Sequence, residues 1–345
     1  MNIEISWAPE TNPALPQVAG DTPIQHVVAC VDGSSTSERA LWYALAIAET
    51  YGAKVTIMRV LETPVRSGAA PADPLGWEVS KIEALDYLER VARHVRDEED
   101  SLELATQLLE GDPAVQACHW IEANAVDLAV LCTHGEGRTE WPLGSTARKL
   151  IDAARCSLLI VPDSVATTQS RIRYERILVP LDGSAWSESV LPVAMHLAEV
   201  HGAELLLAHA VPNAEMTRVG PLSPEDIRLG QRLLDRNERV AREYLEHLRA
   251  RVSATGLRVR VVVARGECAR TELLRLIGDE NPGLITLSSC GSSAQTESPF
   301  GSIAAHLLAY ADRPVLLIRA EQRSARTYRG DHVAAAPRFC TQAIM

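Results

Sequence analysis

The chain has 345 residues, of which 46% are hydrophobic, and its 45 acidic and 34 basic residues give a net charge of -11. This length and hydrophobic content suffice for about two domains, each with its own core, and exclude a chain that is disordered throughout. The negative charge repels phosphate backbones, which argues against nucleic acid as the main partner.

The sequence contains no sign of a membrane span or of a targeting segment. No Lys or Arg precedes Arg39, and the apolar runs, such as residues 128–132, have the length of strands rather than of a bilayer span. The seven cysteines form no CxxC motif and the ten histidines show no metal-binding spacing, so we expect buried free thiols and no metal site. We therefore expect a soluble, cytoplasmic protein with no membrane partner.

Strand-like and helix-like segments alternate through the first half of the chain. Leu41, Leu45 and Ala48 share one face of the first helix, Gly52 ends it, and Pro113 suits the first turn of the third helix. In chain order, the pattern predicts a strand at 26–32, a helix at 36–51, a strand at 54–60, a helix at 77–99, a strand at 102–110, a helix at 113–124, a strand at 127–133, a helix at 145–154 and a strand at 157–162.

The second half repeats this order. At an offset of 150 residues, Asp182-Gly183-Ser184 aligns with Asp32-Gly33-Ser34, and the match extends through the helix that follows. In chain order, the second half predicts a strand at 176–182, a helix at 186–201, a strand at 204–211, a helix at 224–254, a strand at 258–264, a helix at 270–280, a strand at 284–289, a helix at 302–312 and a strand at 314–320.

The long period of this repeat indicates two domains of one fold rather than a solenoid. We predict the domains at 24–163 and 176–320, with a linker at 164–175. The ends, 1–23 and 321–345, lack any hydrophobic period and are expected to be mobile. Two proline-containing stretches, 63–74 and 212–224, are expected to be loops before the long helices that could cover the same face.

Most predicted strands are apolar throughout rather than alternating, which indicates burial on both faces. Together with the intervening helices, they predict an α/β fold in which each domain is a doubly wound parallel sheet. Such sheets bind ligands beyond the carboxyl ends of the strands, where the winding direction reverses. Both Asp-Gly-Ser turns follow the first strand of their domain, which is this position.

A second repeated feature follows the fourth strand of each domain. Residues 132–145 and 288–302 each run from a strand into a glycine and through a loop to a Gly-Ser pair that opens a helix. The first amides of a helix lack partners within it and the helix dipole adds positive charge, so Gly144-Ser145 and Gly301-Ser302 could bind a phosphate. The alternative is an ordinary glycine turn with the serine as the helix cap.

These features, with Gly111-Asp112-Pro113 and Thr133-His134-Gly135, resemble the universal stress protein family over nearly the whole of both predicted domains. The resemblance implies a tandem member with two five-stranded, Rossmann-like sheets in strand order 3-2-1-4-5, related by a pseudo-twofold axis. In relatives, the last strands of two subunits pair, so residues 157–162 and 314–320 should pair within this chain as an intramolecular pseudo-dimer. A homodimer of two such chains is a further option.

The resemblance also implies a site for ATP, with Mg2+ as an optional companion. In ATP-binding members a Pro-x-Asp sequence follows the first strand, and Gly-x2-Gly-x9-Gly-Ser/Thr follows the fourth. The Asp would accept hydrogen bonds from the ribose, the residue after the second strand would contact the adenine, and the glycines would bind the phosphates. The candidate cofactor-binding residues are, in the second domain, Pro180, Asp182, Ala210, Leu287, Ser288, Gly291, Gly301, Ser302 and Ile303 and, in the first, Asp32, Val60, Cys132, Gly135, Gly144, Ser145 and Thr146.

Neither domain matches this ATP pattern throughout. The second keeps the Pro-x-Asp sequence at 180–182 and the nine-residue spacing in 291–301, but it has Ser288 at the first glycine of the motif. The first domain has Cys30 in place of the proline, Cys132 at the first glycine, and a loop that is one residue shorter. The second domain is therefore the better candidate for the nucleotide site.

Two of these features have structural alternatives. Asp32 and Asp182 could form Asx turns that only shape their loops. Cys30 and Cys132 should lie at the ends of neighbouring strands, where they either make the first pocket redox-sensitive or are two buried thiols that never oxidise.

The leading hypothesis is a cytoplasmic stress-response protein that binds adenine nucleotide, ATP first, and acts as a sensor or regulator. The sequence offers no evident catalytic base and no Gly-Lys pair for a P-loop, so no catalytic residue is assigned and any ATP hydrolysis should be slow. The main alternative is an interaction module whose pockets have diverged and no longer bind nucleotide. A third option, an ATP-using nucleotidyl enzyme, is disfavoured because no SGGxDS-type loop follows the first strand.

Overall fold

The computed structural model describes residues 24–62, 73–99, 101–135, 142–165, 171–213, 223–289, 291 and 300–319. The predicted ends 1–23 and 321–345 and most of the predicted loops 63–74 and 212–224 lie outside these residues. No helix in the described ranges is both long and apolar enough to cross a membrane.

Each half of the chain alternates strands and helices, as the sequence predicts. The first half consists of β1 (His26–Val31), α1 (Ser35–Tyr51), β2 (Lys54–Leu61), α2 (Pro74–Glu98), β3 (Leu104–Glu110), α3 (Pro113–Ala123), β4 (Leu128–Cys132), α4 (Ser145–Ala153) and β5 (Ser157–Val161). The second half consists of β6 (Arg176–Pro180), α5 (Ala185–Glu188), α6 (Leu191–His201), β7 (Glu204–Pro212), α7 (Pro224–Ser253), β8 (Arg258–Gly266), α8 (Ala269–Glu280), β9 (Leu284–Ser288), α9 (Ser302–Tyr310) and β10 (Val315–Ile318).

The sequence predicts one helix over 186–201, and the structure has two, α5 and α6. Pro192 falls in the first turn of α6 and has no N–H to donate to a carbonyl one turn earlier. The Ser189 hydroxyl donates to the Trp186 carbonyl at 2.7 Å, where α5 ends. In the first half α1 has no proline and runs unbroken over 17 residues.

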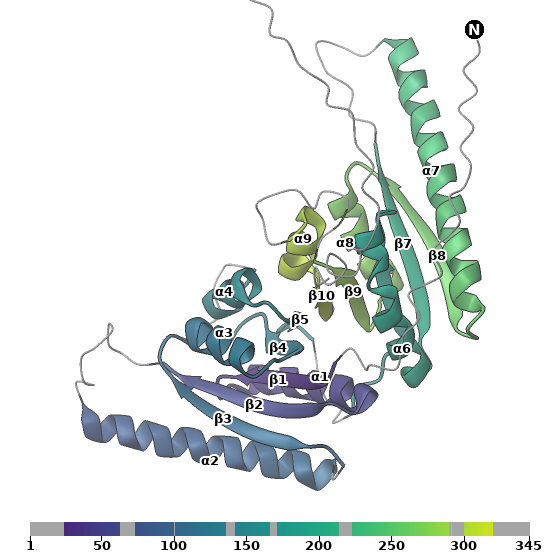
Figure 1. Cartoon of the computed structure of the whole chain (residues 1–345). Helices are drawn as coiled ribbons and strands as arrows, with labels where there is room; N and C mark the ends of the chain where they lie inside the picture. The colour runs from purple at the N-terminus through teal and green to yellow at the C-terminus, as the bar shows by residue number, and fades with distance from the viewer. Residues whose placement is uncertain are drawn as a thin grey trace, which may run out of the picture.

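The ten strands form one sheet in the order β3-β2-β1-β4-β5-β10-β9-β6-β7-β8. Within each half the strands are parallel and follow the predicted order 3-2-1-4-5. β5 and β10 pair antiparallel at the centre of the sheet, with Leu316 opposite Leu159 (Figure 1). The predicted pairing of the two last strands within one chain is therefore confirmed.

Two hydrophobic clusters cover the two faces of this sheet, and both cross the centre. One packs under α1, α2, α6 and α7 and includes Leu159 and Leu316. The other packs under α3, α4, α8 and α9 and includes Leu158 and Leu317. Each face thus has a core shared by both halves, which fixes the halves relative to each other.

Polar contacts between α1 and α6 join the halves as well. The Tyr51 hydroxyl donates to the Val193 carbonyl at 3.4 Å, and the Thr50 hydroxyl lies 3.1 Å from His201 Nε2. The Tyr174 ring, which is fully buried, lies 4.7 Å from the His201 ring. Burial lowers the pKa of His201, so this seam holds a neutral imidazole at neutral pH.

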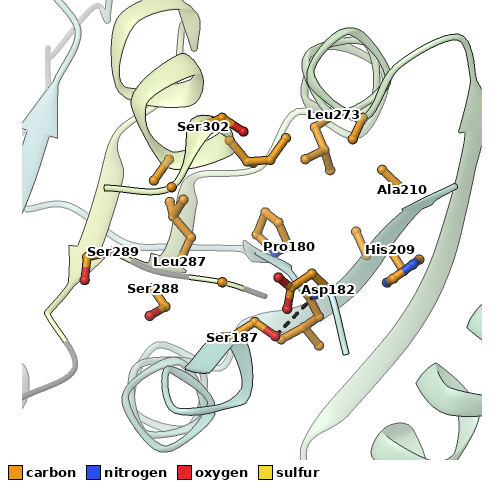
Figure 2. A pocket seen from close by; sticks show the side chains of 17 residues that line it. Pro180, Asp182, Ser187, His209, Ala210, Leu273, Leu287, Ser288, Ser289 and Ser302 are labelled. Carbon is orange, nitrogen blue, oxygen red and sulfur yellow. Dashed lines mark hydrogen bonds between the residues drawn. The ribbon is translucent and has the colours of Figure 1, made fainter. Parts of the chain in front are cut away.

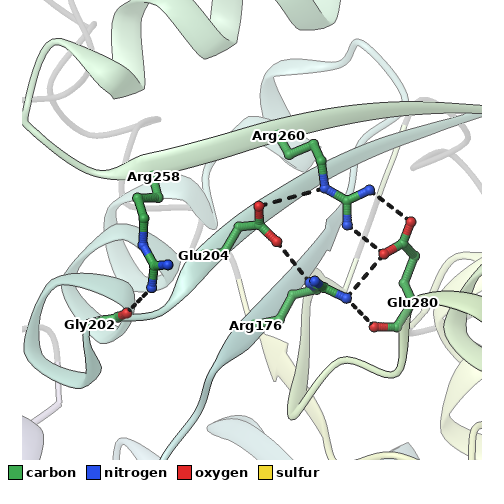
Figure 3. A network of polar contacts seen from close by, with 6 residues as sticks. All are labelled: Arg176, Gly202, Glu204, Arg258, Arg260 and Glu280. Atoms are coloured by element: carbon green, nitrogen blue, oxygen red, sulfur yellow. Dashed lines mark hydrogen bonds and ion pairs between the residues drawn. The ribbon is translucent and has the colours of Figure 1, made fainter.

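Four charged side chains form a network at the amino ends of the strands in the second half (Figure 3). Arg176 donates from Nε to Glu204 at 2.8 Å and from Nη1 to Glu280 at 3.1 Å. Arg260 donates from Nη1 to Glu280 at 2.9 Å. Arg176 and Glu204 begin β6 and β7, Arg260 is the third residue of β8, and Glu280 ends α8. The network therefore lies at the edge of the sheet opposite the predicted ligand edge.

Candidate functional site

Each half has a cavity at the carboxyl ends of its strands. The second-half cavity, of about 320 Å³, is formed by the ends of β6, β7 and β9 and the first residues of α8 and α9 (Figure 2). The first-half cavity, of about 620 Å³, is formed by the ends of β1, β2 and β4 and the first residues of α3 and α4. In the sheet, β1 lies between β2 and β4, and β6 lies between β7 and β9. The chain therefore winds away from β1 and from β6 in both directions, and both cavities lie where the winding direction reverses.

All of the residues predicted from the sequence line one of these two cavities. The second-half cavity contains Pro180, Asp182, Ala210, Leu287, Ser288, Gly291, Gly301, Ser302 and Ile303. The first-half cavity contains Asp32, Val60, Cys132, Gly135, Gly144, Ser145 and Thr146. Among the described residues, no cluster of three or more His, Cys, Asp or Glu side chains is arranged to hold a metal ion.

The aspartate of each Asp-Gly-Ser turn reaches across to the glycine that follows the fourth strand. Asp182 Oδ1 accepts from the Ser184 N–H at 3.0 Å, which is the Asx turn considered as an alternative. A Cβ added to Gly291 would overlap the other carboxylate oxygen, Oδ2. The carboxylate therefore shapes its own turn with one oxygen and fills the space beside the loop glycine with the other.

The first half repeats this arrangement. Asp32 Oδ1 accepts from the Ser34 N–H at 2.9 Å, and a Cβ on Gly135 would overlap Asp32 Oδ2. A side chain at this position would displace the aspartate carboxylate, and glycine avoids this contact in both halves.

α4 and α9, which follow the fourth strand of each half and begin at the cavities, have no side-chain cap. Their N-cap residues are Gly144 and Gly301, whose own N–H groups donate to the carbonyls of Thr133 and Ser289, both at 2.8 Å. In contrast, a serine, aspartate or cysteine side chain caps α1, α2, α3, α5, α7 and α8. The alternative in which the serines cap these helices is wrong, since Ser145 and Ser302 are the first helical residues.

A family model described as the universal stress protein family matches residues 23–162 and again 173–319. The chain belongs to the universal stress protein family. A universal stress protein of Methanocaldococcus jannaschii is 31% identical over 147 residues, which are 41% of this chain and 84% of that protein.

Tandem relatives align with most of the chain. A universal stress protein of Mycobacterium tuberculosis is 24% identical over 307 residues, 86% of this chain and 97% of that protein. The crystal structure of a universal stress protein from Archaeoglobus fulgidus has a TM-score of 0.58 at 16% identity, covering 86% of this chain and 97% of that chain. This structural likeness supports the fold of this universal stress protein.

Sequence reasoning missed the side chains at the end of the second strand of each half. Arg59, on β2, and His209, on β7, line their cavities at positions that the offset of 150 residues aligns. The Arg59 guanidinium lies 5.0 Å from the centre of the Tyr87 ring, and the His209 ring lies 6.3 Å from that of Tyr244. Applying the offset to this strand end would have found the pair.

Cys30 and Cys132 lie at the ends of neighbouring strands, as predicted, but on opposite faces of the sheet. Cys132 belongs to the core under α1, and its thiol donates to the Thr36 carbonyl at 2.9 Å. Cys30 packs against the core on the other face. Burial raises the pKa of each thiol to about 12. Side chains on opposite faces cannot form a disulfide without a movement of the backbone, and both cysteines are free in the structure.

Proposed function

We propose that this universal stress protein binds an adenine nucleotide, with ATP as the first candidate, and binds it more tightly in the second-half cavity than in the first. One observation carries the proposal. The helix that enters each cavity from the fourth strand begins at a glycine with no side-chain cap, although most described helices have such a cap. Uncapped first-turn amides beside a cavity suit a phosphate group.

The rest of the second-half cavity suits a nucleoside. Its walls are mostly small or aliphatic, with Ala210 and Leu273 on one side and Leu287 on the other (Figure 2). Ala208 and Ile303 also line it. Such walls favour a planar base. Asp182 lines the same cavity just beyond the carboxyl end of β6, where we expect a ribose to present its hydroxyls. Mg2+ would arrive with the phosphates of ATP.

The preference for the second half rests on the side chains at the predicted contact positions. Pro180 and Ser288 occupy the positions of Cys30 and Cys132 in the first half. The Ser288 side chain is the smaller intrusion at the first glycine of the phosphate motif. The backbone closure is the same in both halves, so the difference in affinity should arise from these side chains.

We further propose that the protein acts in the cytoplasm through its bound state, as a sensor or regulator. Among the described residues that line the second-half cavity there is no lysine or arginine to stabilise a transferring phosphate. Any ATP hydrolysis should therefore be slow. The alternative, an interaction module that no longer binds nucleotide, predicts an empty protein.

The test begins with protein purified without added nucleotide, which is denatured so that mass spectrometry can identify any released nucleotide. ATP is then titrated by calorimetry into the wild type and the Gly301→Val and Gly144→Val variants. Among the described residues, the nearest atoms to a Cβ at Gly301 lie 3.9 Å away, so we expect the valine variant to fold and to obstruct the ligand. A Cβ at Gly144 lies 3.1 Å from the Thr133 carbonyl, so the unfolding temperature of that variant must be measured without ligand.

The matched control is Gly278→Val in α8, because an added Cβ there has open space around it and the residue lies outside both cavity linings. Gly301→Val should abolish the tighter ATP site, Gly144→Val the weaker one, and Gly278→Val neither. The absence of both released nucleotide and ATP binding would establish the interaction module instead. Loss of the tighter site in Gly144→Val alone would reverse the assignment of the halves.

A further inference from the structure

The first-half cavity contains a positive charge that the second lacks. Arg59 is the one lysine or arginine among the described residues that line the first-half cavity, and His209 takes its place in the second. Burial is the main cause that lowers the pKa of His209, which makes its ring neutral at pH 7. The two cavities therefore differ by about one unit of charge at equivalent positions.

The Arg59 guanidinium is held in a fixed place. It lies over the Tyr87 ring, whose exposed fraction is only 6%, and it covers the Asp32-Gly33 turn. A Cβ added to Gly33 would lie 3.1 Å from the guanidinium carbon. Since β1 and β2 are adjacent, with Arg59 opposite Val31, the sheet itself sets this position beside the turn.

This guanidinium has no salt bridge to an acidic group of the described residues. Its side chain instead makes a cation–π contact with the Tyr87 ring. Glu62, which also lines the cavity, forms no ion pair with it. A half-buried guanidinium without a carboxylate partner is suited to pair with an anionic ligand, because its planar donors match a phosphate.

We propose that the first-half cavity takes an adenine nucleotide whose ribose carries a phosphate on its 2′ or 3′ oxygen, and that Arg59 binds this phosphate. The inference rests on the proposed function, because it assumes that the Asp32 turn faces the ribose hydroxyls. A phosphate on either hydroxyl would then lie over the turn, where the guanidinium is. An arginine beside the ribose plays this part in dinucleotide-binding folds that accept a 2′-phosphate.

The two anion-binding features lie on opposite sides of that turn. β1 lies between β2, which carries Arg59, and β4, which leads to α4. The uncapped α4 N-terminus would hold the 5′-phosphates on one side, and Arg59 would hold the ribose phosphate on the other. In the second half the same position has a neutral imidazole, so an extra phosphate there would lie beside the Asp182 carboxylate without a cation.

The test compares adenosine 5′-monophosphate with adenosine 2′,5′-bisphosphate, adenosine 3′,5′-bisphosphate and 3′,5′-cyclic AMP. Binding is measured by calorimetry in the Gly301→Val background, which leaves the first-half cavity as the site. We expect at least one bisphosphate to bind about 10-fold or more tightly than the monophosphate, the gain of a charge-assisted hydrogen bond. The cyclic nucleotide distinguishes a free phosphate from a diester that bridges the ribose.

Arg59→Met removes the charge and keeps an unbranched chain over Tyr87, and it should remove the gain while leaving monophosphate binding within about 3-fold. Arg59→Lys should retain part of the gain. The matched control, His209→Met, should leave the first-half affinities unchanged. Unfolding temperatures of all variants without ligand check that each is folded.

The outcomes separate this inference from the proposed function. Monophosphate binding without any gain from the extra phosphate would overturn the role of Arg59 and leave the nucleotide site standing. An equal loss for all ligands in Arg59→Met would overturn it too, because the arginine would then only support the cavity. If no adenine nucleotide binds the first half, both the inference and the proposed function of that half fail.

Discussion

Gly291→Ala should weaken nucleotide binding in the second half by moving Asp182. An added Cβ would lie closer than 3.0 Å to Asp182 Oδ2, and its three nearest atoms all belong to the Asp182 side chain. Gly291 does not have a positive φ, so alanine is compatible with the backbone. The change therefore acts on one carboxylate and leaves the rest of the cavity in place.

The geometry sets the size of the effect. To restore van der Waals distance, the carboxylate oxygen has to move by roughly 1 Å, which is enough to break a hydrogen bond to a ribose hydroxyl. A hydrogen bond to a charged group contributes about 1.5–3 kcal/mol, so the dissociation constant should rise about 10- to 150-fold.

The assay is calorimetric titration of ATP in the Gly144→Val background, in which the first-half site is expected to be abolished. Gly291→Ala, Asp182→Ala and the double variant form a cycle, and Gly278→Ala is the control without a contact. Because both single changes remove the same interaction, the double variant should bind about as weakly as either one. Unchanged affinity in Gly291→Ala, or fully additive losses, would refute the ribose-binding role of Asp182.

Two further predictions concern stability. Burial lowers the pKa of His26, whose Nδ1 donates to the Asn124 carbonyl at 3.2 Å, so the unfolded chain binds more protons. The contribution of neutral His26 to the free energy of unfolding is complete above about pH 6.5 and is lost as the pH falls below that value, at up to about 1.4 kcal/mol per pH unit. His26→Gln should therefore reduce the dependence of the unfolding free energy on pH, measured by urea unfolding between pH 7 and 5. Arg260 lowers the pKa of Glu280, so that contribution is present above about pH 4.5 and lost as the pH falls through the lower folded value. Glu280→Gln should lower the free energy of unfolding by about 1–2 kcal/mol at pH 7, a modest amount because the ion pairs of Glu280 are partly exposed (Figure 3). The loss should be much smaller at pH 2, where protonation of Glu280 weakens these ion pairs. Equal losses at both pH values would contradict the ionic role.

Much of the site could be predicted because it depends on backbone features that short sequences encode. Apolar runs locate the strands, and the carboxyl ends of adjacent parallel strands must lie together, so the Asp-Gly-Ser turns and the loop glycines could be placed at one edge. The closeness of Asp182 to Gly291 follows from that arrangement. Which oxygen shapes the turn and which faces the glycine depends on a rotamer that the sequence does not specify.

The features that could not be predicted depend on register and packing. Cys30 and Cys132 end neighbouring strands, but Val31, not Cys30, has its side chain on the same face as Cys132. A shift of one residue in register moves a side chain to the other face of a sheet, and no local pattern sets this register. Arg59 was missed for a similar reason, since its role depends on Tyr87 in a helix far along the chain.

The antiparallel pairing of β5 with β10 has a consequence for how the two cavities could communicate. All strands of one half run opposite to those of the other, so the carboxyl ends of the two halves lie at opposite edges of the sheet. One small ligand cannot reach both cavities. Any coupling between them must pass through the shared cores and the seam of α1 and α6, where Tyr51 and His201 make contacts across the halves. The Tyr51 hydroxyl is buried and donates to a backbone carbonyl, and both cores cross the centre of the sheet, so we expect the two cavities to fill with little cooperativity unless a ligand shifts α1 or α6.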